Sequence, residues 1–297
     1  GKPRSRIAYL CASKRMDWEP VAWTEFDGKN IVFTDIQKGP VMRVATYERG
    51  RLRFWTDPFE INVSNEFHFF TPSDSVQDVT LFAKYTLRAD EMFLNRMIGG
   101  TFEGSNDPDF REKEVLYLIN EKPKRLQTVV QSYSSKSYRY VRYIGPKDSH
   151  CNIAEAAFYT PNDTASLKGK VIGTPGCFQK DGSHEYTNVF DGDVTTSFDY
   201  IEPSGGWSGL DLGTPKQIGR IVYTPRSYDN YIRSGDDYEL FYCARRNNWK
   251  SLGDQRSKAD SLIYIKIPVN ALLLLCNNTR GIQERIFVYT AAEQIWK

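Results

Sequence analysis

Histidine, methionine and cysteine are scarce in this chain, whose 297 residues include 3 His, 4 Met and 5 Cys. Three histidines supply few general bases, and none of the cysteines stands in the sequence context of a catalytic nucleophile. The cysteines form no Cys-x-x-Cys pair and no cluster with histidine, which disfavours a structural zinc site. These shortages predict a protein that is not an enzyme.

Two further features are missing, namely an excess of charge of one sign and a long apolar run. Lys and Arg total 39 against 37 Asp and Glu, the two signs are interspersed, and the formal net charge is only +2. Nucleic-acid binding needs a basic patch, which this pattern does not supply. The longest unbroken apolar run covers residues 271–276, far short of the ~20 residues that a membrane helix needs. We therefore expect neither a nucleic-acid partner nor membrane insertion.

Aromatic residues are abundant instead, at 14% of the chain. Aromatic and β-branched side chains favour strands, and short apolar runs alternate along the chain with turn signals. Gly28-Lys29-Asn30 and Glu48-Arg49-Gly50 each stand between two such runs, as in a hairpin. The best helical candidate, residues 90–97, is only about two turns long. The pattern predicts an all-β chain built from sandwiches or barrels.

Two segments of the chain share an order of features. Residues 102–159 and residues 238–289 each start with a strand, continue through polar and apolar runs, and close on a strand that contains a glutamate. A repeated order marks duplicated units. Between the two segments, residues 160–170 are polar and contain proline and glycine, which suits a linker. We therefore predict two tandem β-sandwich domains, residues 1–160 and residues 161–297.

Five ordered motifs in the second half carry a family resemblance. They are the run 189–196 (Val-Phe-Asp-Gly-Asp-Val-Thr-Thr), the runs 206–213 and 218–226, the strand 238–242 and the closing run 284–289. In this order they resemble the discoidin or coagulation-factor C-type family, whose fold is a galactose-binding-like jelly-roll sandwich. The resemblance covers residues 168–292. Residues 102–159 resemble the second half of the same fold, whereas residues 5–100 lack a Phe-Asp-Gly-Asp counterpart and are either a divergent sandwich or a separate small β domain.

The whole arrangement resembles the C-terminal β-sandwich pair of secreted bacterial transglutaminase-like proteins, in which a papain-like catalytic domain precedes such modules. None of the five cysteines of this chain has the context of that domain's nucleophile. The resemblance implies an extracytoplasmic location, which is periplasmic, cell-surface or secreted. It also implies an accessory role beside an enzyme or a cell-surface protein.

The acidic turn at residues 191–193 has the chemistry of a cation site. Its two carboxylates and the hydroxyls of Thr195 and Thr196 are oxygen ligands of the kind that calcium prefers. The alternative is a turn that satisfies its own hydrogen bonds without a metal, since Asp-Gly is a common turn dipeptide. The family resemblance implies a structural calcium held by Asp191, Asp193, Thr196 and Glu284. Phe198 stands close to where the family usually has a tryptophan.

A glycan site is predicted in the loops at one end of the second sandwich, where aromatic rings meet sugar C–H groups and polar side chains grip hydroxyls. The loop 227–234 concentrates that chemistry. The predicted carbohydrate-binding residues are Tyr200, Tyr228, Asp229, Asn230, Tyr231 and Arg233. The alternative is a solvated loop whose tyrosines close the end of the core. At the end of the preceding strand, Arg226 is expected to pin a neighbouring carboxylate with its guanidinium group.

Most other aromatic residues are assigned to the core. Trp23 and Trp55 lie inside strand patterns, whereas Trp18, between two acidic residues, is the better exposed candidate. Leu210 and Leu212 stand two residues apart on one strand, so we expect both to face the core.

These features predict a non-catalytic pair of carbohydrate-binding modules outside the cytoplasm, with a glycan or a glycoprotein as the partner. A second hypothesis is a structural spacer or protein-docking sandwich without sugar affinity, which the motif-poor first half fits equally well. A hydrolase or transferase is the third hypothesis, and it requires a Cys–His pair or paired carboxylates across a cleft.

Overall fold

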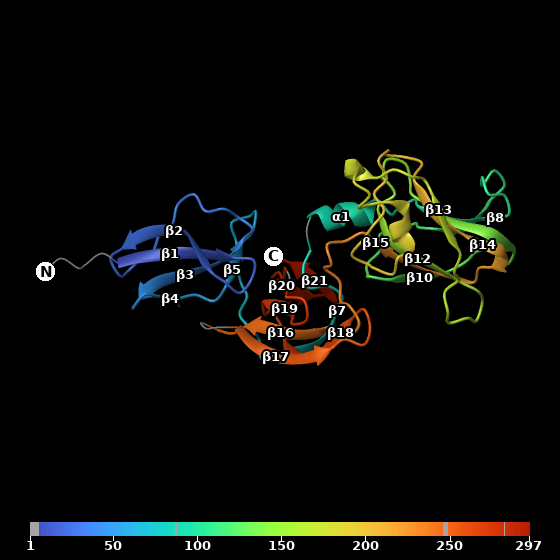
Figure 1. The fold of residues 1–297 in the computed structure, drawn as a ribbon. Helices are drawn as coiled ribbons and strands as arrows, with labels where there is room; N and C mark the ends of the chain where they lie inside the picture. Colours follow the sequence, from blue (N-terminus) through green and yellow to red (C-terminus); the bar gives the residue numbers. More distant parts are fainter. Residues whose placement is uncertain (1–5, 87, 246–248, 282) are drawn as a thin grey trace. The chain divides into compact units, whose positions relative to one another are not determined.

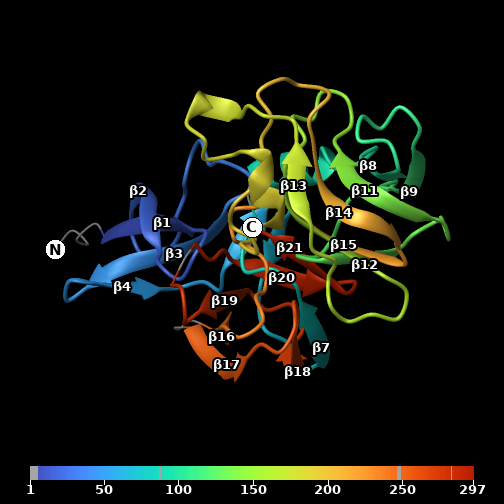
Figure 2. The ribbon, with the colours of Figure 1, turned by 45° about the vertical axis from the view of Figure 1, so that its right-hand side comes forward.

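Strands dominate the computed structural model, which describes residues 6–86, 88–245, 249–281 and 283–297 (Figures 1 and 2). Strands hold 45% of the residues and helices 6%, so the prediction of an all-β chain is confirmed. The helical candidate at residues 90–97 corresponds to α1 (Arg88–Asn95), which begins two residues earlier than expected. Within the described residues, no helix is long and apolar enough to cross a membrane.

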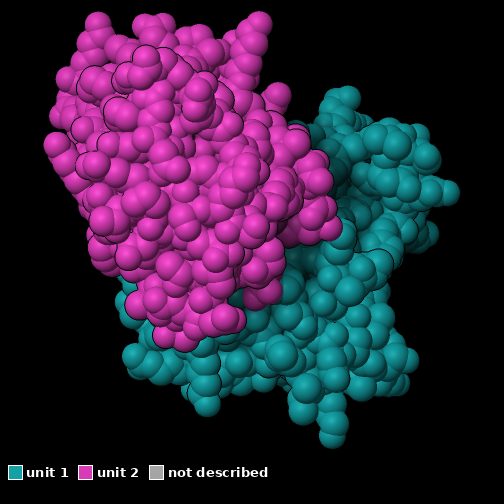
Figure 3. Space-filling view, turned by 90° about the vertical axis from the view of Figure 1, so that its right-hand side faces the viewer, with its two compact units in different colours: residues 1–86, 232–297 teal, residues 87–231 magenta. Residues whose placement is uncertain are grey.

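The chain forms two compact units whose bounds differ from those of the predicted domains (Figure 3). The first unit is discontinuous and combines residues 1–86 with residues 232–297, while the second comprises residues 87–231. The predicted boundary at residues 160 and 161 lies inside the second unit. The physical reason is non-local strand pairing, because strands on the two sides of the expected linker share their sheets. Val141 pairs with Leu210 in this way, and Phe158 pairs with Ile221.

Two antiparallel sheets make up the second unit. The larger has the strand order β13-β14-β11-β8-β9, and the smaller has the order β10-β15-β12. The strands are β8 (Thr101–Ser105), β9 (Glu114–Leu118), β10 (Thr128–Gln131), β11 (Ser137–Ile144), β12 (Ile153–Tyr159), β13 (Lys170–Gly173), β14 (Trp207–Gln217) and β15 (Arg220–Pro225). Two short 3-10 helices, η1 (Phe178–Lys180) and η2 (Tyr186–Phe190), join β13 to β14 together with the intervening loops.

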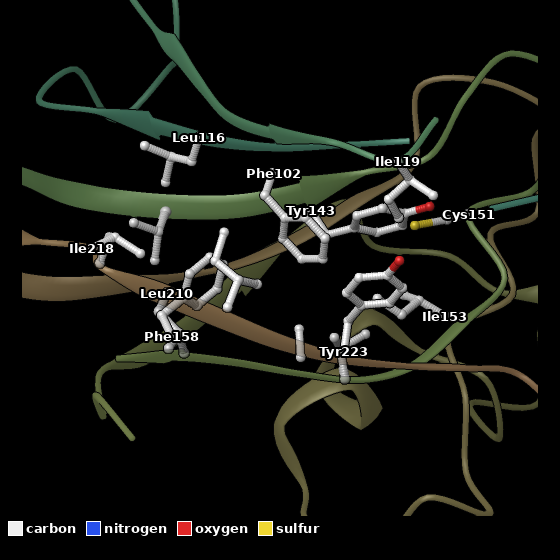
Figure 4. Close-up of a cluster of buried hydrophobic side chains, with 14 of the residues drawn as sticks. Phe102, Leu116, Ile119, Tyr143, Cys151, Ile153, Phe158, Leu210, Ile218 and Tyr223 are labelled. Atoms are coloured by element: carbon white, nitrogen blue, oxygen red, sulfur yellow. The ribbon is translucent and has the colours of Figure 1, made fainter. Parts of the chain in front are cut away.

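The core of the second unit lies between its two sheets (Figure 4). Phe102 and Tyr143 enter it from the five-stranded sheet, and Phe158 and Tyr223 enter it from the three-stranded sheet. The ring centroid of Phe102 lies 5.0 Å from that of Tyr143 and 5.4 Å from that of Tyr223. The first pair packs within the five-stranded sheet and the second bridges the two sheets, so much of the aromatic surplus in this part of the sequence serves packing.

Strand β14 follows the alternation that its sequence predicts. Leu210 is buried in the core and Leu212 packs against the same cluster, which confirms their assignment to one face. Asp211, between them, points the other way and forms an ion pair with Arg139 at 2.8 Å. At Gly209 a Cβ atom would lie 2.2 Å from a backbone oxygen of the neighbouring strand β11. The close approach of β11 and β14 therefore requires glycine at this position.

The first unit contains three sheets. One has the order β2-β1-β3-β5-β6 with β4 paired to β3, a second has the order β17-β16-β19-β20-β21, and the third pairs β18 with β7. The strands from the first segment are β1 (Arg6–Ser13), β2 (Glu19–Phe26), β3 (Val41–Glu48), β4 (Arg51–Phe54), β5 (Phe59–Ile61), β6 (Phe67–Phe69) and β7 (Val76–Leu81). Those from the last segment are β16 (Asp237–Cys243), β17 (Trp249–Arg256), β18 (Leu262–Pro268), β19 (Leu273–Asn277), β20 (Phe287–Thr290) and β21 (Glu293–Trp296).

The pairing of β7 with β18 explains why the first unit is discontinuous. Leu81 pairs with Leu262 and Val79 pairs with Tyr264, so strands from the beginning and the end of the chain form one ladder. All four of these side chains are buried in a single core cluster. Within the described residues the five cysteines form no disulfide, and this core is held by packing and backbone hydrogen bonds.

One of the two predicted hairpins forms in the first unit. Strands β3 and β4 pair around the turn at residues 48–51, where Arg49 and Gly50 both have positive φ, so that prediction is confirmed. The hairpin expected around residues 28–30 is wrong, because residues 31–34 form no strand in the described structure. That segment instead lays Phe33 and Ile36 against the buried face of the N-terminal sheet. An apolar run that covers a sheet cannot be told from a strand by hydrophobicity alone.

Three tryptophan assignments are also wrong. Trp23 is 65% exposed and Trp55 is 46% exposed, although both were assigned to the core. For Trp23, strand alternation indicates the period but not which face is buried, whereas Trp55 lies just after the end of β4. Trp18, expected to be exposed, is half-buried, with its ring centroid 6.0 Å from that of Phe54 and 5.2 Å from the guanidinium carbon of Arg43.

Candidate functional site

Helix α1 of the second unit has one buried face and one exposed face. Asp90, Phe93 and Leu94 are buried, while the remaining positions are exposed or half-buried. Acidic residues in the first turn favour a helix start there, because they complement the positive end of the helix dipole. The chain turns away at Gly99, whose φ of +93° suits glycine. The two faces of α1 contact two different loops.

The loop at residues 226–231 packs on the buried face of α1. The backbone N–H of Tyr228 donates to Asp90 Oδ1 at 3.2 Å, and the Tyr228 ring centroid lies 5.8 Å from that of Phe93. Tyr231 is buried in a cluster with Leu94 and its burial raises the pKa of its hydroxyl. The loop that was predicted to hold sugar therefore supports the helix with several of its residues.

The six predicted carbohydrate-binding residues lie in different local environments. Asn230 and Tyr231 are buried, which matches the alternative in which tyrosines close the end of the core. Tyr228 and the left-handed Asp229 remain partly accessible. Arg233 belongs to the first unit, where its backbone N–H donates to the hydroxyl of Tyr238 at 2.8 Å.

Tyr200 lies on a separate segment of the second unit. Its ring centroid is 5.9 Å from that of Phe198, and its side chain covers Gly206 so closely that a Cβ there would lie 2.7 Å from it. Its backbone carbonyl is 2.9 Å from Nδ1 of His150. Tyr200 is half-buried and therefore acts mainly as packing between loops.

Arg226 holds a carboxylate, as the sequence predicts. Its Nη1 donates to Asp199 Oδ2 at 2.6 Å and to Asn152 Oδ1 at 3.2 Å. Its guanidinium carbon also lies 4.4 Å from the ring centroid of Phe93 in α1. Asn152 in turn donates from Nδ2 to Asp199 Oδ1 at 3.2 Å. This buried network joins the end of β15, the helix and the loop that precedes β12.

That loop is strained. Within residues 148–152, four non-glycine residues have positive φ, namely Asp148, His150, Cys151 and Asn152. Each such conformation costs of order 1–3 kcal/mol and persists only where the surroundings enforce it. Ser149 Oγ accepts a hydrogen bond from the backbone N–H of Cys151 at 3.1 Å, and Ser204 Oγ accepts one from Asp148 at 3.0 Å. Strain of this kind is concentrated at functional sites, which draws attention to the neighbouring surface.

A groove of about 810 Å³ separates the exposed face of α1 from the segment 146–149. We call it the α1 groove, and its size lies within the range of small-ligand sites. Its basic side chains are Arg88, Arg96 and Lys147, and its acidic ones are Glu91 and Asp148. Asn95 adds an amide, while Met92, Ile98 and Pro146 supply apolar surface. Glu91 is held by an ion pair with Lys122 at 2.7 Å.

The α1 groove offers hydrogen-bond donors and acceptors beside apolar surface, with charges that nearly balance. Such a lining can orient a small polar ligand without an excess of either sign. Sequence reasoning missed it, because its two walls lie about 50 residues apart in the chain and neither carries a motif. The sequence indicated the helix near residue 90 but carried no signal for the opposite wall at residues 146–149.

The predicted cation turn satisfies many of its own hydrogen bonds. Thr196 Oγ1 donates to Asp191 Oδ2 at 2.7 Å, and Thr195 Oγ1 donates to Asp193 Oδ1 at 2.6 Å. Glu284 belongs to the first unit, where it pairs with Arg15 at 2.8 Å. These bonds match the alternative of a self-satisfied turn.

Glu155 of β12 takes the place expected for Glu284. Its Oε1 accepts a hydrogen bond from the backbone N–H of Gly192 at 2.9 Å. Burial, and then the neighbouring Asp191, raises the pKa of Glu155 to about 8. A signal for this residue was present in the sequence, because the run 154–159 parallels the run 284–289 and each contains a glutamate.

The oxygens around Glu155 are those that a hard cation takes. The Glu155 carboxylate faces that of Asp191, whose Oδ2 also accepts a hydrogen bond from the Thr196 hydroxyl. A positive ion between the two carboxylates would lower the cost of ionising both. Among the described residues, no group of three or more His, Cys, Asp or Glu side chains has the arrangement of a metal site. A cavity of about 190 Å³ borders Glu155 and Lys168.

Comparisons of the chain with protein-family models, with curated proteins and with solved structures found no match.

Proposed function

We propose that the chain is a non-catalytic carbohydrate-binding module pair, accessory to an enzyme or a cell-surface protein outside the cytoplasm, and that the α1 groove holds the glycan. The observation that carries the proposal is the groove itself, built between a helix and a strained loop. Its lining alternates hydrogen-bonding groups with apolar patches. A sugar presents the same mixture of hydroxyls and C–H faces.

Charge supports a neutral or weakly charged ligand. Three basic and two acidic side chains line the groove, and Glu91 is already paired with Lys122. The Arg226 network supports the proposal as well, because it contacts α1 through Phe93 and the loop 148–152 through Asn152. Both walls of the groove are therefore held in place before binding, and the protein loses less conformational entropy when a ligand binds.

We further propose a discoidin-like jelly roll for the second unit, with the two halves of the fold in exchanged order along the chain. In support, residues 102–159, which resemble the second half of that fold, share both sheets with the motifs of residues 206–226. A relationship to the C-terminal sandwiches of secreted transglutaminase-like proteins remains part of this proposal and rests on the sequence motifs alone.

A structural calcium is proposed at the turn, with Glu155 and Asp191 as its two carboxylates and the Thr196 hydroxyl beside them. The ion would supply positive charge that neutralises the facing carboxylates. A ligand that binds only the folded state stabilises it by about 2.7 kcal/mol at a hundredfold excess over Kd. Calcium should therefore raise the Tm of the chain relative to EDTA, and Glu155→Gln should abolish the rise while Glu284→Gln keeps it. Equal Tm values in calcium and in EDTA would contradict this part.

A glycan array followed by titration calorimetry on the full chain tests the groove. Asn95→Ala and Lys147→Ala remove groove side chains, and Lys216→Ala removes an exposed lysine of the same unit outside the groove. We expect the two groove variants to bind about fivefold more weakly or worse, since the loss of a central contact costs about 1 kcal/mol or more. Lys216→Ala should bind like the wild type. Equal binding by all variants would refute the groove as the site.

The second candidate function is a spacer or protein-docking module without sugar affinity. The burial of Asn230 and Tyr231 favours it, because these residues were expected to contact the glycan. Absence of binding by the wild type across the array would support this candidate over the first.

A further inference from the structure

Strands β2, β1 and β3 lie side by side in the N-terminal sheet of the first unit (Figure 1). One face of these strands carries exposed aromatic side chains. Trp23 of β2 is 65% exposed and Tyr47 of β3 is 50% exposed, while Tyr9 of β1 is half-buried. The opposite face of these strands packs on a core where Leu10 and Met42 are buried. On the aromatic face, the far end of β3 is buried at Val41 and Arg43, and only the part around Tyr9 and Tyr47 is accessible. Side chains alternate between the faces of a strand, so the aromatic residues stand away from that core.

The strand register sets these rings side by side. Trp23 pairs with Tyr9, and Tyr9 pairs with Ala45, two residues before Tyr47. Opposite residues on neighbouring strands share a face at about 5 Å, and the Tyr9 and Tyr47 ring centroids lie 5.0 Å apart. Ala45, in the middle, is small and buried, so the rings stand above it. We call Trp23, Tyr9 and Tyr47 the aromatic strip.

Size and charge restrict what the aromatic strip can hold. Contiguous exposed apolar surface marks a contact site, but a stable protein interface uses about 20–30 residues a side. The strip and its apolar neighbours Ile7 and Leu52 are too few for a second copy of the chain. In the registers of these strands, the exposed charged side chain on this face is Glu25, opposite Ile7. An acidic residue there disfavours a polyanion.

We propose that the aromatic strip is a second carbohydrate site, which takes a neutral glycan with its pyranose rings stacked on Trp23 and Tyr47. The C–H face of a pyranose is apolar and matches an aromatic face. The indole N–H, the tyrosine hydroxyls and the Glu25 carboxylate supply donors and acceptors for the sugar hydroxyls. The inference rests on the proposed function for its ligand class, but its residues belong to the other unit and are tested separately.

The test uses the full chain and three soluble neutral polysaccharides, a β-glucan, a galactomannan and a xylan, in affinity gel electrophoresis. Trp23→Ala and Tyr47→Ala remove rings of the strip, and Tyr47→Phe keeps the ring without its hydroxyl. Trp55→Ala is the matched control, because Trp55 is also exposed but its indole N–H donates to Thr46, which faces the other side of β3. Thermal denaturation verifies that each variant is folded.

We expect the wild type to be retarded by at least one polysaccharide. Trp23→Ala and Tyr47→Ala should each raise the Kd of the chain for that polysaccharide about tenfold or more. Tyr47→Phe and Trp55→Ala should change this Kd less than about threefold. The inference is overturned if no polysaccharide retards the wild type or if Trp23→Ala behaves like Trp55→Ala. Loss of binding in Lys147→Ala but not in Trp23→Ala would overturn this inference alone, and the reverse would overturn the groove alone.

Discussion

Arg226→Met should destabilise the second unit far more than Arg139→Met, although each change removes an arginine from an ion pair with an aspartate. Arg226 Nη1 lies 2.6 Å from Asp199 Oδ2, and the two side chains are 16% and 11% exposed. Arg139 Nε lies 2.8 Å from Asp211 Oδ1, and there the side chains are 43% and 20% exposed. The pairs have similar geometry, so burial is the variable that separates them.

The expected magnitudes follow from that difference. Removing one partner of a buried pair costs roughly 3–5 kcal/mol, because the other charge stays buried without a counter-ion. Asp199 keeps a hydrogen bond from Asn152 at 3.2 Å and some contact with solvent, so we expect Arg226→Met to lose about 2–3 kcal/mol of unfolding free energy. Exposed pairs contribute about 0–1 kcal/mol, which sets the expectation for Arg139→Met. At about 3 °C per kcal/mol, the Tm should fall by roughly 6–9 °C and by at most ~3 °C, respectively.

Thermal denaturation of the full chain measures the decrease in Tm for each variant, and hydrogen exchange shows which segments lose stability. Arg226→Met should speed exchange in α1 and in residues 148–152, because Phe93 and Asn152 both contact the Arg226 side chain. Adding Asp199→Asn to that variant should recover part of the loss, since it removes the uncompensated charge. Equal Tm falls for the two single variants would refute the reasoning, as would unchanged exchange in both segments.

Two further predictions concern Glu155 and the tyrosines of the 226–231 loop. Without a bound cation the folded-state pKa of Glu155 is raised from 4.5 to about 8. In EDTA the wild type should therefore lose stability as the pH rises between those values and change little from this source above them. Glu155→Gln should lack this loss in urea unfolding at a series of pH values, and parallel curves for the two proteins would contradict the raised pKa. Tyr231→Ala should lower the unfolding free energy by roughly 3–4 kcal/mol, because it leaves a cavity in the buried cluster that Tyr231 forms with Leu94. Tyr228 is exposed, so Tyr228→Ala should cost about 1 kcal/mol or less. Similar urea midpoints for the two variants would argue against the buried role of Tyr231.

Local patterns in the sequence were sufficient for the features that depend on neighbouring residues. The strand content, the helix near residue 90, the turn at residues 48–51 and the alternation of Leu210 and Leu212 each follow from short-range chemistry. The sequence also predicted that Arg226 holds a carboxylate, because a guanidinium group at a strand end suits such a partner, but the fold alone brings Asp199 to it from 27 residues away.

Features that depend on non-local pairing could not be predicted in this way. The pairing of β11 with β14 and of β7 with β18 determines the bounds of the two units. The sequence pattern of each strand is compatible with many partner strands, so it does not predict these pairs. The same limit placed Trp23 in the core, since alternation does not reveal which face another segment covers. Glu155 was visible in the repeat, but only the fold brings it to Gly192.

The central claim is that the α1 groove binds a glycan, and hydrogen exchange of the full chain with and without the strongest array ligand tests it most directly. Binding there should slow exchange in residues 88–98 and 146–149, which form the two walls of the groove. A glycan that binds the chain while leaving the exchange of both segments unchanged would contradict the claim.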